Sequence, residues 1–214
     1  MEKQDKEHLY RYFPDLSETQ WGQLELLPSL YQEWNAKINV ISRKDIDNIV
    51  INHILHSMSI GKYITFAPNT KVFDIGTGGG FPGIPLSILY PKASFTLIDS
   101  VGKKIKVVKE IINAVGLKNA TAIQVRAEEL KGERCHFVVS RAAMSLERLV
   151  GISQSLVDVR NEFNPIKNGI IALKGGDLTE ELAQVKRPIE LSGVATYFQE
   201  IPFYEEKKIV YVPL

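Results

Sequence analysis

The chain has 214 residues, of which 44% are hydrophobic and 24% charged, with a net charge of +1. These proportions are typical of a folded globular protein and exclude a wholly disordered chain. The small net charge excludes a nucleic-acid binder that relies on bulk positive charge, although it leaves room for a local basic face. The single cysteine, Cys135, excludes an internal disulfide and any metal site built from paired cysteines.

The beginning of the chain, MEKQDKEHLYRYF, carries charges throughout and does not have the apolar centre of a signal peptide. No run approaches the roughly 18 apolar residues that a membrane span needs. We therefore expect a cytoplasmic protein without a membrane partner or a bound metal, and we expect a monomer. Residues 1–69 are predicted to be a helical extension packed on a domain formed by residues 70–214.

The N-terminal segment shows helical spacing and helix-start signals. Ser17 is placed to cap a helix, with Gln20 at the partner position of a capping box. Asp45 is predicted to cap a second helix, and Pro68-Asn69 indicates a turn before the first strand. The first helix is expected to bury residues that recur at helical spacing, namely Leu24, Leu27, Leu30, Tyr31 and Trp34.

From residue 70 the pattern becomes strand, loop, helix, repeated, which predicts an α/β fold with a mostly parallel, Rossmann-like sheet. Two alternating runs at the end, 195–203 and 207–212, predict an antiparallel C-terminal strand pair. Ligands of parallel sheets bind beyond the carboxyl ends of the strands. The predicted strands are 71–75, 95–98, 121–125, 137–139 and 169–173, and the predicted helices are 82–89, 103–115, 146–157 and 179–185.

The stretch VFDIGTGGGFPGIP contains the end of the first of these strands and the glycine loop that follows it, and it has three interpretations. Gly78, Gly80 and Gly83 match G-x-G-x-x-G, which in nicotinamide enzymes brings a pyrophosphate to a helix N-terminus. In a different register, Asp74 ends the strand before Gly76 and Gly78. An acidic residue there would repel a pyrophosphate and suits a cationic ligand such as S-adenosylmethionine. A tight turn without a ligand is the third possibility.

Several segments in the range 34–175 together resemble the bacterial small-subunit ribosomal RNA guanine-N7 methyltransferases known as RsmG or GidB. Among them, "DIGTGGGFPGIPL" and "DSVGKK" are far more specific than a glycine pattern. The chain departs from the family in two places, with Gly79 where a proline is common and His56 where Asp is common. The matching segments are WNAKIN at 34–39, HIL at 53–55, DIGTGGGFPGIPL at 74–86, DSVGKK at 99–104, SRA at 140–142 and LKG at 173–175.

The resemblance implies a class I methyltransferase that moves a methyl group from S-adenosylmethionine to N7 of a guanine in the 530 loop of 16S rRNA, at position 527 in the usual rRNA numbering. The partner would be 16S rRNA or the small ribosomal subunit. N7 carries a lone pair and no proton, so no general base is expected. Arg141 is expected to act by positioning, gripping either the methionine carboxylate or an RNA phosphate.

Carried over from the family, the cofactor contacts fall at Gly76, Phe81, Ala127, Glu128 and Arg141. Asp74, Gly78 and Asp99 join them on physical grounds, because an acid suits the cationic donor and Asp99 could accept both ribose hydroxyls. For three of these side chains, a purely structural role that involves no ligand stays open. Phe81 could be a core aromatic, Glu128 could simply start a short helix, and Arg141 could form a surface ion pair.

Basic residues near the predicted strand ends are candidates for holding RNA phosphates, although each could equally belong to a solvated face. His56 is given no role, and His53 either packs on a helix face or shapes the cofactor pocket. Two functional alternatives to the methyltransferase stay open, a non-catalytic RNA-binding relative and a nicotinamide-dependent oxidoreductase. The RNA-binding candidates are Lys103, Lys104, Arg126, Arg148 and Lys174.

Overall fold

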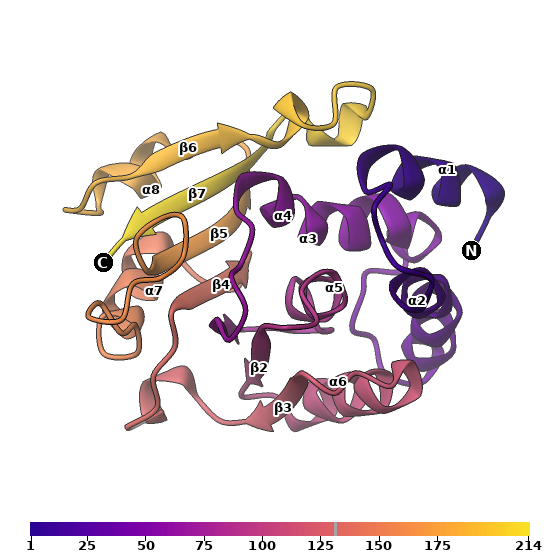
Figure 1. The fold of residues 1–214 in the computed structure, drawn as a ribbon, viewed down its shortest axis with the longest axis horizontal. Coiled ribbons are helices and arrows are strands. Elements are labelled where there is room, and N and C mark those ends of the chain that lie inside the picture. The colour runs from indigo at the N-terminus through magenta and orange to yellow at the C-terminus, as the bar shows by residue number, and fades with distance from the viewer. Residues whose placement is uncertain (131) are drawn as a thin grey trace.

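The structure is a computed structural model that describes residues 1–130 and 132–214. Its centre is a seven-stranded sheet in the order β3-β2-β1-β4-β5-β7-β6, in which β1 to β5 run parallel and β7 is antiparallel to both β5 and β6 (Figure 1). The predicted mostly parallel sheet with an antiparallel C-terminal pair is therefore confirmed. The strands are β1 (Lys71–Ile75), β2 (Ser94–Asp99), β3 (Ala120–Gln124), β4 (Phe137–Arg141), β5 (Gly169–Gly175), β6 (Glu190–Gly193) and β7 (Lys207–Pro213).

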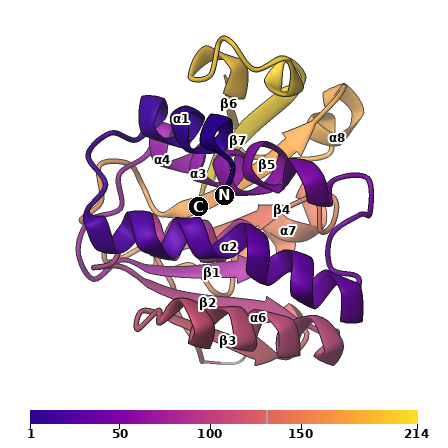
Figure 2. The ribbon, with the colours of Figure 1, turned by 90° about the vertical axis from the view of Figure 1, so that its right-hand side faces the viewer.

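Helices cover both faces of the sheet, with α1 to α6 on one side and α7 and α8 on the other (Figure 1). Successive strand residues point to opposite faces of the sheet. Val72 packs in the core on the side of α1 to α6, and Phe73 in the core on the side of α7 and α8. Figure 2 shows α2 running across the front of the sheet. The α-helices are α1 (Lys3–Tyr12), α2 (Glu18–Lys37), α3 (His56–Met58), α4 (Ile60–Tyr63), α5 (Gly83–Leu89), α6 (Gly102–Val115), α7 (Leu146–Ser153) and α8 (Thr179–Ala183).

The N-terminal helices share one core with the sheet. Leu24 and Leu27 of α2 are completely buried in the same cluster as Leu97 of β2. The capping box predicted at the start of α2 is present, because the Ser17 hydroxyl accepts from the Gln20 N–H and the Gln20 side chain accepts from the Ser17 N–H. None of the helices in residues 1–130 and 132–214 is long and apolar enough to cross a membrane.

Two predicted elements differ from the structure. Asp45 does not cap a helix, because its carboxylate instead accepts a hydrogen bond from the Asn52 side chain. It precedes a 3-10 turn (Ile46–Asn48) and a π-helical segment (Val50–Leu55) that continues into α3. The predicted strand over 195–203 is also wrong, since 3-10 turns occupy Val194–Thr196 and Pro202–Tyr204, and β6 lies earlier.

The error at 195–203 has a physical cause. The buried residues are Val194, just before this segment, and Phe198 and Ile201 within it, which are spaced by four and three positions. Such spacing is typical of helical turns rather than of a strand, whose side chains alternate with period two. The apparent alternation in the sequence therefore reflected small and polar residues on a turn.

Candidate active site

The glycine loop leaves β1 at the point where the strand order reverses, between β1 and β4. The N–H groups of Gly76 and Thr77 both donate to the Ile98 carbonyl, at 2.9 Å each. Gly76 and Gly78 have φ values of +70° and +57°, a region that glycine adopts without strain. The loop therefore turns sharply above the sheet and exposes bare backbone at the switch point, where ligands of such sheets bind.

Close packing as well as φ requires a glycine at position 76. A Cβ atom there would lie 2.3 Å from the Cβ atom of Ala143, which belongs to the loop after β4. The two loops beyond β1 and β4 thus touch each other across the missing side chain. On the other side of the glycine loop, the Tyr31 hydroxyl of α2 donates to the Gly79 carbonyl at 2.6 Å.

Asp74 is completely buried behind the loop and lines neither of the two cavities described below. Its Oδ2 accepts from the Thr77 hydroxyl at 2.6 Å and from the Gly83 N–H at 2.8 Å. Burial raises the pKa of Asp74 to about 7, although both hydrogen bonds favour the charged form. Asp74 therefore ties the loop to the start of α5, and any influence on a ligand acts through the loop.

Asp74→Asn is expected to change how stability depends on pH. Because the pKa of Asp74 is raised by folding, its protonated form is the one favoured in the folded state, and stability falls as pH rises from about 4 to about 7. Asparagine can still accept the two hydrogen bonds with its Oδ1. Thermal midpoints at pH 5 and pH 8 should show wild type losing stability relative to the variant. A constant difference across this range would contradict the raised pKa.

A cavity of about 450 Å³, here called the glycine-loop cavity, opens between the loops that follow β1, β2, β3 and β4. All of the predicted cofactor contacts except Asp74 line it, and of the predicted RNA-binding residues Lys103 and Lys174 do not. Val40, Ser100 and Met144 also line it and were not predicted, since Val40 and Met144 lie outside the motifs and Ser100, although part of DSVGKK, had no assigned role. The predicted residues in its wall are Gly76, Gly78, Phe81, Asp99, Lys104, Arg126, Ala127, Glu128, Arg141 and Arg148.

Asp99 ends β2 and holds two loops together. Its Oδ2 accepts from the Gly78 N–H at 3.0 Å and its Oδ1 from the Val101 N–H at 2.9 Å. A carboxylate has about four acceptor positions, so two hydrogen bonds leave it able to accept more. Asp99 can therefore position the glycine loop and still bind hydroxyl groups of a ligand in the cavity.

Arg141 ends β4 and is half-buried between the loop and the π-helical segment. Its guanidinium donates to the Asn52 carbonyl at 3.2 Å and to His53 Nδ1 at 2.7 Å, and it lies 5.0 Å from the centre of the Phe81 ring. Burial lowers the pKa of Arg141 to about 10, so it is still a cation at neutral pH. Among the described residues it has no carboxylate at ion-pair distance.

His53 supports this cation as a neutral ring. Burial and the charge of Arg141 lower the pKa of His53 to about 4. Since Nδ1 accepts from a guanidinium, which has no acceptor, the hydrogen of the neutral ring belongs on Nε2. The sequence left open whether His53 packs on a helix face or shapes the cofactor pocket, and its support of Arg141 was not predicted.

Two of the predicted basic residues are engaged in ion pairs. Arg148 of α7 pairs with Glu128 at 2.7 Å across the mouth of the glycine-loop cavity, where both side chains are largely exposed. Lys174 is well buried, donating to Glu181 at 2.6 Å and to the Met144 carbonyl at 2.7 Å. Lys174 therefore anchors the loop after β4. Lys103 is exposed on α6 and lines neither of the cavities described in this section.

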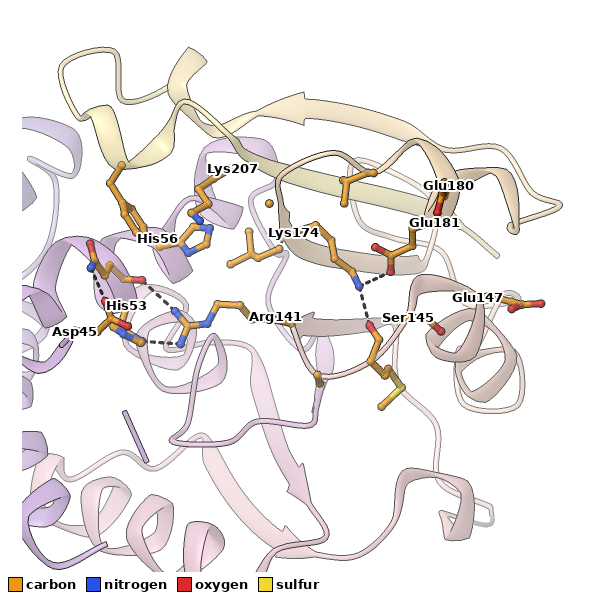
Figure 3. Close-up of a pocket in the computed structure, with 18 of the residues that line it drawn as sticks. Asp45, His53, His56, Arg141, Ser145, Glu147, Lys174, Glu180, Glu181 and Lys207 are labelled. Carbon is orange, nitrogen blue, oxygen red and sulfur yellow. Dashed lines mark hydrogen bonds and ion pairs between the residues drawn. The ribbon is translucent and has the colours of Figure 1, made fainter. Parts of the chain in front are cut away.

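A second cavity, of about 1030 Å³, lies beyond β5 and is here called the β5–α8 cavity (Figure 3). It shares residues 141–144 with the glycine-loop cavity, so one short segment separates the two. Figure 3 shows Arg141 pointing from this segment toward His53, while Lys174 and Glu181 lie on the opposite side. In residues 1–130 and 132–214, no group of three or more His, Cys, Asp or Glu side chains is arranged to hold a metal ion.

The residues of the glycine-loop cavity fit S-adenosylmethionine. Its volume lies within the range of small-molecule sites. Its walls offer bare loop backbone, a carboxylate with free acceptor positions at Asp99 and an unpaired cation at Arg141 among the described residues. The carboxylate of Asp99 is suited to accept hydrogen bonds from ribose hydroxyls, and the guanidinium of Arg141 is suited to bind a methionine carboxylate.

Solved structures with a similar fold are methyltransferases and related proteins. A variant of MtNAS in complex with S-adenosylmethionine aligns with a TM-score of 0.58 at 14% identity, covering 91% of this chain and 76% of that one. Aeropyrum pernix fibrillarin with natively bound S-adenosyl-L-methionine aligns with a TM-score of 0.53 at 11% identity, covering 74% and 73%. These likenesses confirm a Rossmann-like class I methyltransferase fold.

The sequence itself matches much closer relatives. A ribosomal RNA small subunit methyltransferase G from Bacteroides thetaiotaomicron is 50% identical over 205 residues, covering 96% of this chain and 98% of the relative. Another from Phocaeicola vulgatus is 51% identical over 209 residues, covering 97% and 98%. The GidB family, described as rRNA small subunit methyltransferase G, matches residues 20–210. The chain therefore belongs to the GidB family and is an S-adenosylmethionine-dependent rRNA methyltransferase.

Proposed function

We propose that this chain methylates N7 of a guanine in the 530 loop of 16S rRNA, as a monomer acting in the cytoplasm. The observation that supports this most is the short wall of residues 141–144, which has the glycine-loop cavity on one side and the β5–α8 cavity on the other. A methyl donor and an unstacked base could thus approach each other at one point. The choice of N7 and of the 530 loop rests on the family resemblance.

S-adenosylmethionine, when bound, supplies a methyl group attached to a cationic sulfonium. Within the glycine-loop cavity, we assign Arg141 to the methionine carboxylate and Asp99 to the ribose hydroxyls. The backbone at Gly76 and Gly78 allows close approach, and Phe81 lies beneath the guanidinium of Arg141. Ala127 and Glu128 are assigned to the adenine, because both line the cavity on the loop after β3.

The chemistry at N7 requires orientation rather than proton transfer. The N7 lone pair attacks directly, so the protein does not need a general base, and His53 is a neutral support rather than a proton acceptor. Orientation of reactants can lower a barrier by roughly 7–11 kcal/mol in favourable cases. The target base must leave its stack to reach the donor. Arg126, Arg148 and Lys104, which line the glycine-loop cavity, remain our candidates for phosphate contacts, together with Lys103, which precedes Lys104 on α6.

The proposed function is tested by methyl transfer from labelled S-adenosylmethionine to small subunits from a strain that lacks the gene, followed by mass mapping of the RNA. We expect a single new 7-methylguanine, located in the 530 loop. Protein-free 16S rRNA and an assembly intermediate are compared in parallel. Label on an exocyclic group, on a ring carbon or at another guanine would overturn the assignment of the acceptor, and absence of transfer would favour a non-catalytic RNA-binding relative.

A further inference from the structure

The β5–α8 cavity has a wall that the proposed function does not yet use. His56 of α3, Phe203 and Lys207 at the start of β7 form this wall, here called the basic wall. Figure 3 shows Lys207 and His56 side by side near Arg141, whereas Glu147, Glu180 and Glu181 lie on the other side of the cavity. The cations Arg141 and Lys207 therefore lie on one side of the cavity together with the carboxylate of Asp45, whereas the three glutamates and Lys174 lie on the other side.

Lys207 is held in place without an acidic partner. Its Nζ lies 4.7 Å from the centre of the Phe203 ring, and the described residues offer no carboxylate at ion-pair distance. Opposite it in the ladder is Gly175, where a Cβ atom would lie 3.3 Å from Nζ. The missing side chain on β5 thus leaves space for the ammonium group at the edge of the cavity.

His56 brings a buried polar atom to the same wall. Its side chain is only 5% exposed, and its Nε2 has no hydrogen-bond partner among the described residues. Its ring packs edge-on to Phe203 with centroids 6.0 Å apart. Burial lowers the pKa of His56 well below its ordinary value, and the charges of Arg141 and Lys207 act in the same direction. An anion at the wall would offset the positive charges of Arg141 and Lys207.

We propose that the basic wall binds a phosphate of the rRNA strand that carries the target guanine, with Lys207 as the principal contact. This inference rests on the proposed function, because it takes RNA as the ligand of the β5–α8 cavity. Lys207 and His56 do not line the glycine-loop cavity, so the anion they bind is separate from the methionine carboxylate assigned to Arg141. A lysine ammonium is a common phosphate ligand that acts as a point charge.

The test measures equilibrium binding of undermethylated small subunits at several salt concentrations. For Lys207→Gln we expect affinity to fall roughly tenfold, as for loss of one charge-assisted hydrogen bond. The slope of log affinity against log salt should decrease by about 0.7, the value for one phosphate contact on a single strand. Affinity for S-adenosylmethionine should stay unchanged, and Lys207→Arg should restore most of the RNA affinity.

The matched control is Lys208→Gln. Lys208 is the next residue of β7 and donates to the Gly176 carbonyl at 3.2 Å, so it projects away from Lys207. Its replacement should leave the salt slope unchanged. An unchanged slope for Lys207→Gln, or a loss of S-adenosylmethionine affinity in that variant, would overturn the proposal. If mapping instead places the methyl group on another base while the slope still falls, the proposed acceptor fails and the phosphate contact stands.

Discussion

Methyl transfer by Arg141→Ala is expected to fall by about 30- to 1,000-fold, which corresponds to roughly 2–4 kcal/mol for losing one partner of a desolvated charged contact. The reason is the isolation of this guanidinium, which is half-buried, bonded to Asn52 and His53, and without a carboxylate partner in residues 1–130 and 132–214. Its planar fork matches a carboxylate or a phosphate in two-point contact. Steady-state kinetics with S-adenosylmethionine and small subunits measure the loss.

Two further measurements separate the roles of Arg141. If it holds the methionine carboxylate, affinity for S-adenosylmethionine falls in the variant, and Arg141→Lys recovers only part of it. If it holds an RNA phosphate, the salt dependence of RNA binding changes instead. Arg134→Ala is the control, because Arg134 is exposed just before β4, at the opposite end of the same strand. Full activity of Arg141→Ala with an intact fold would contradict both assignments.

Gly76→Ala should both destabilise the protein and remove S-adenosylmethionine binding. A left-handed conformation costs a non-glycine residue about 1–2 kcal/mol, and overpacking adds about 1–3 kcal/mol. The contact at 2.3 Å is with the Cβ atom of Ala143, which cannot rotate away. For a chain of this size the total predicts a thermal midpoint lower by roughly 5–15 °C. The two loops would have to separate, which deforms the wall of both cavities.

Gly116→Ala isolates the backbone part of this effect. Gly116 ends α6 with a φ of +71°, close to that of Gly76, but no atom lies within 4 Å of an added Cβ. Its replacement should cost only the conformational part and leave activity intact. Ala143→Gly introduced into Gly76→Ala should recover much of the lost stability, because it removes the atom that the new methyl group meets. Equal destabilisation at positions 76 and 116 would show that the packing argument is wrong.

The strand and helix order of residues 70–175 was predictable because each element carries its own local pattern. Parallel strands read as short apolar runs, and α6 shows a clean apolar stripe ended by Gly116. The grouping of Gly76, Asp99, Ala127 and Arg141 at one cavity followed from the rule for the carboxyl ends of strands. Their roles toward a ligand were predicted from the residue types and the resemblance and stay predictions.

Other features depend on contacts between distant parts of the chain, which a single sequence does not reveal. Lys174 was predicted to be a cation available to RNA. It instead pairs with Glu181, because α8 returns toward β5. The partnership of Arg141 with His53 joins residues 88 positions apart. Lys207 faces a cavity because it pairs with Gly175 across the β5–β7 ladder. In each case the residue type is visible in the sequence, whereas its neighbours are determined by the tertiary fold.

The hydrogen bond from Tyr31 to Gly79 has a consequence for how the protein is made. During synthesis α2 is made before the glycine loop. The hydrogen bond from the Tyr31 hydroxyl to the Gly79 carbonyl can therefore form only after the loop has been made. Because Tyr31 is fully buried in the folded protein, its hydroxyl is not in contact with solvent and depends on the Gly79 carbonyl for its hydrogen bond. A chain beginning at residue 70 would contain every glycine of the loop but would lack Tyr31, whose hydroxyl donates to the Gly79 carbonyl. The binding site is therefore a product of the whole chain, completed only when its first and middle thirds have met.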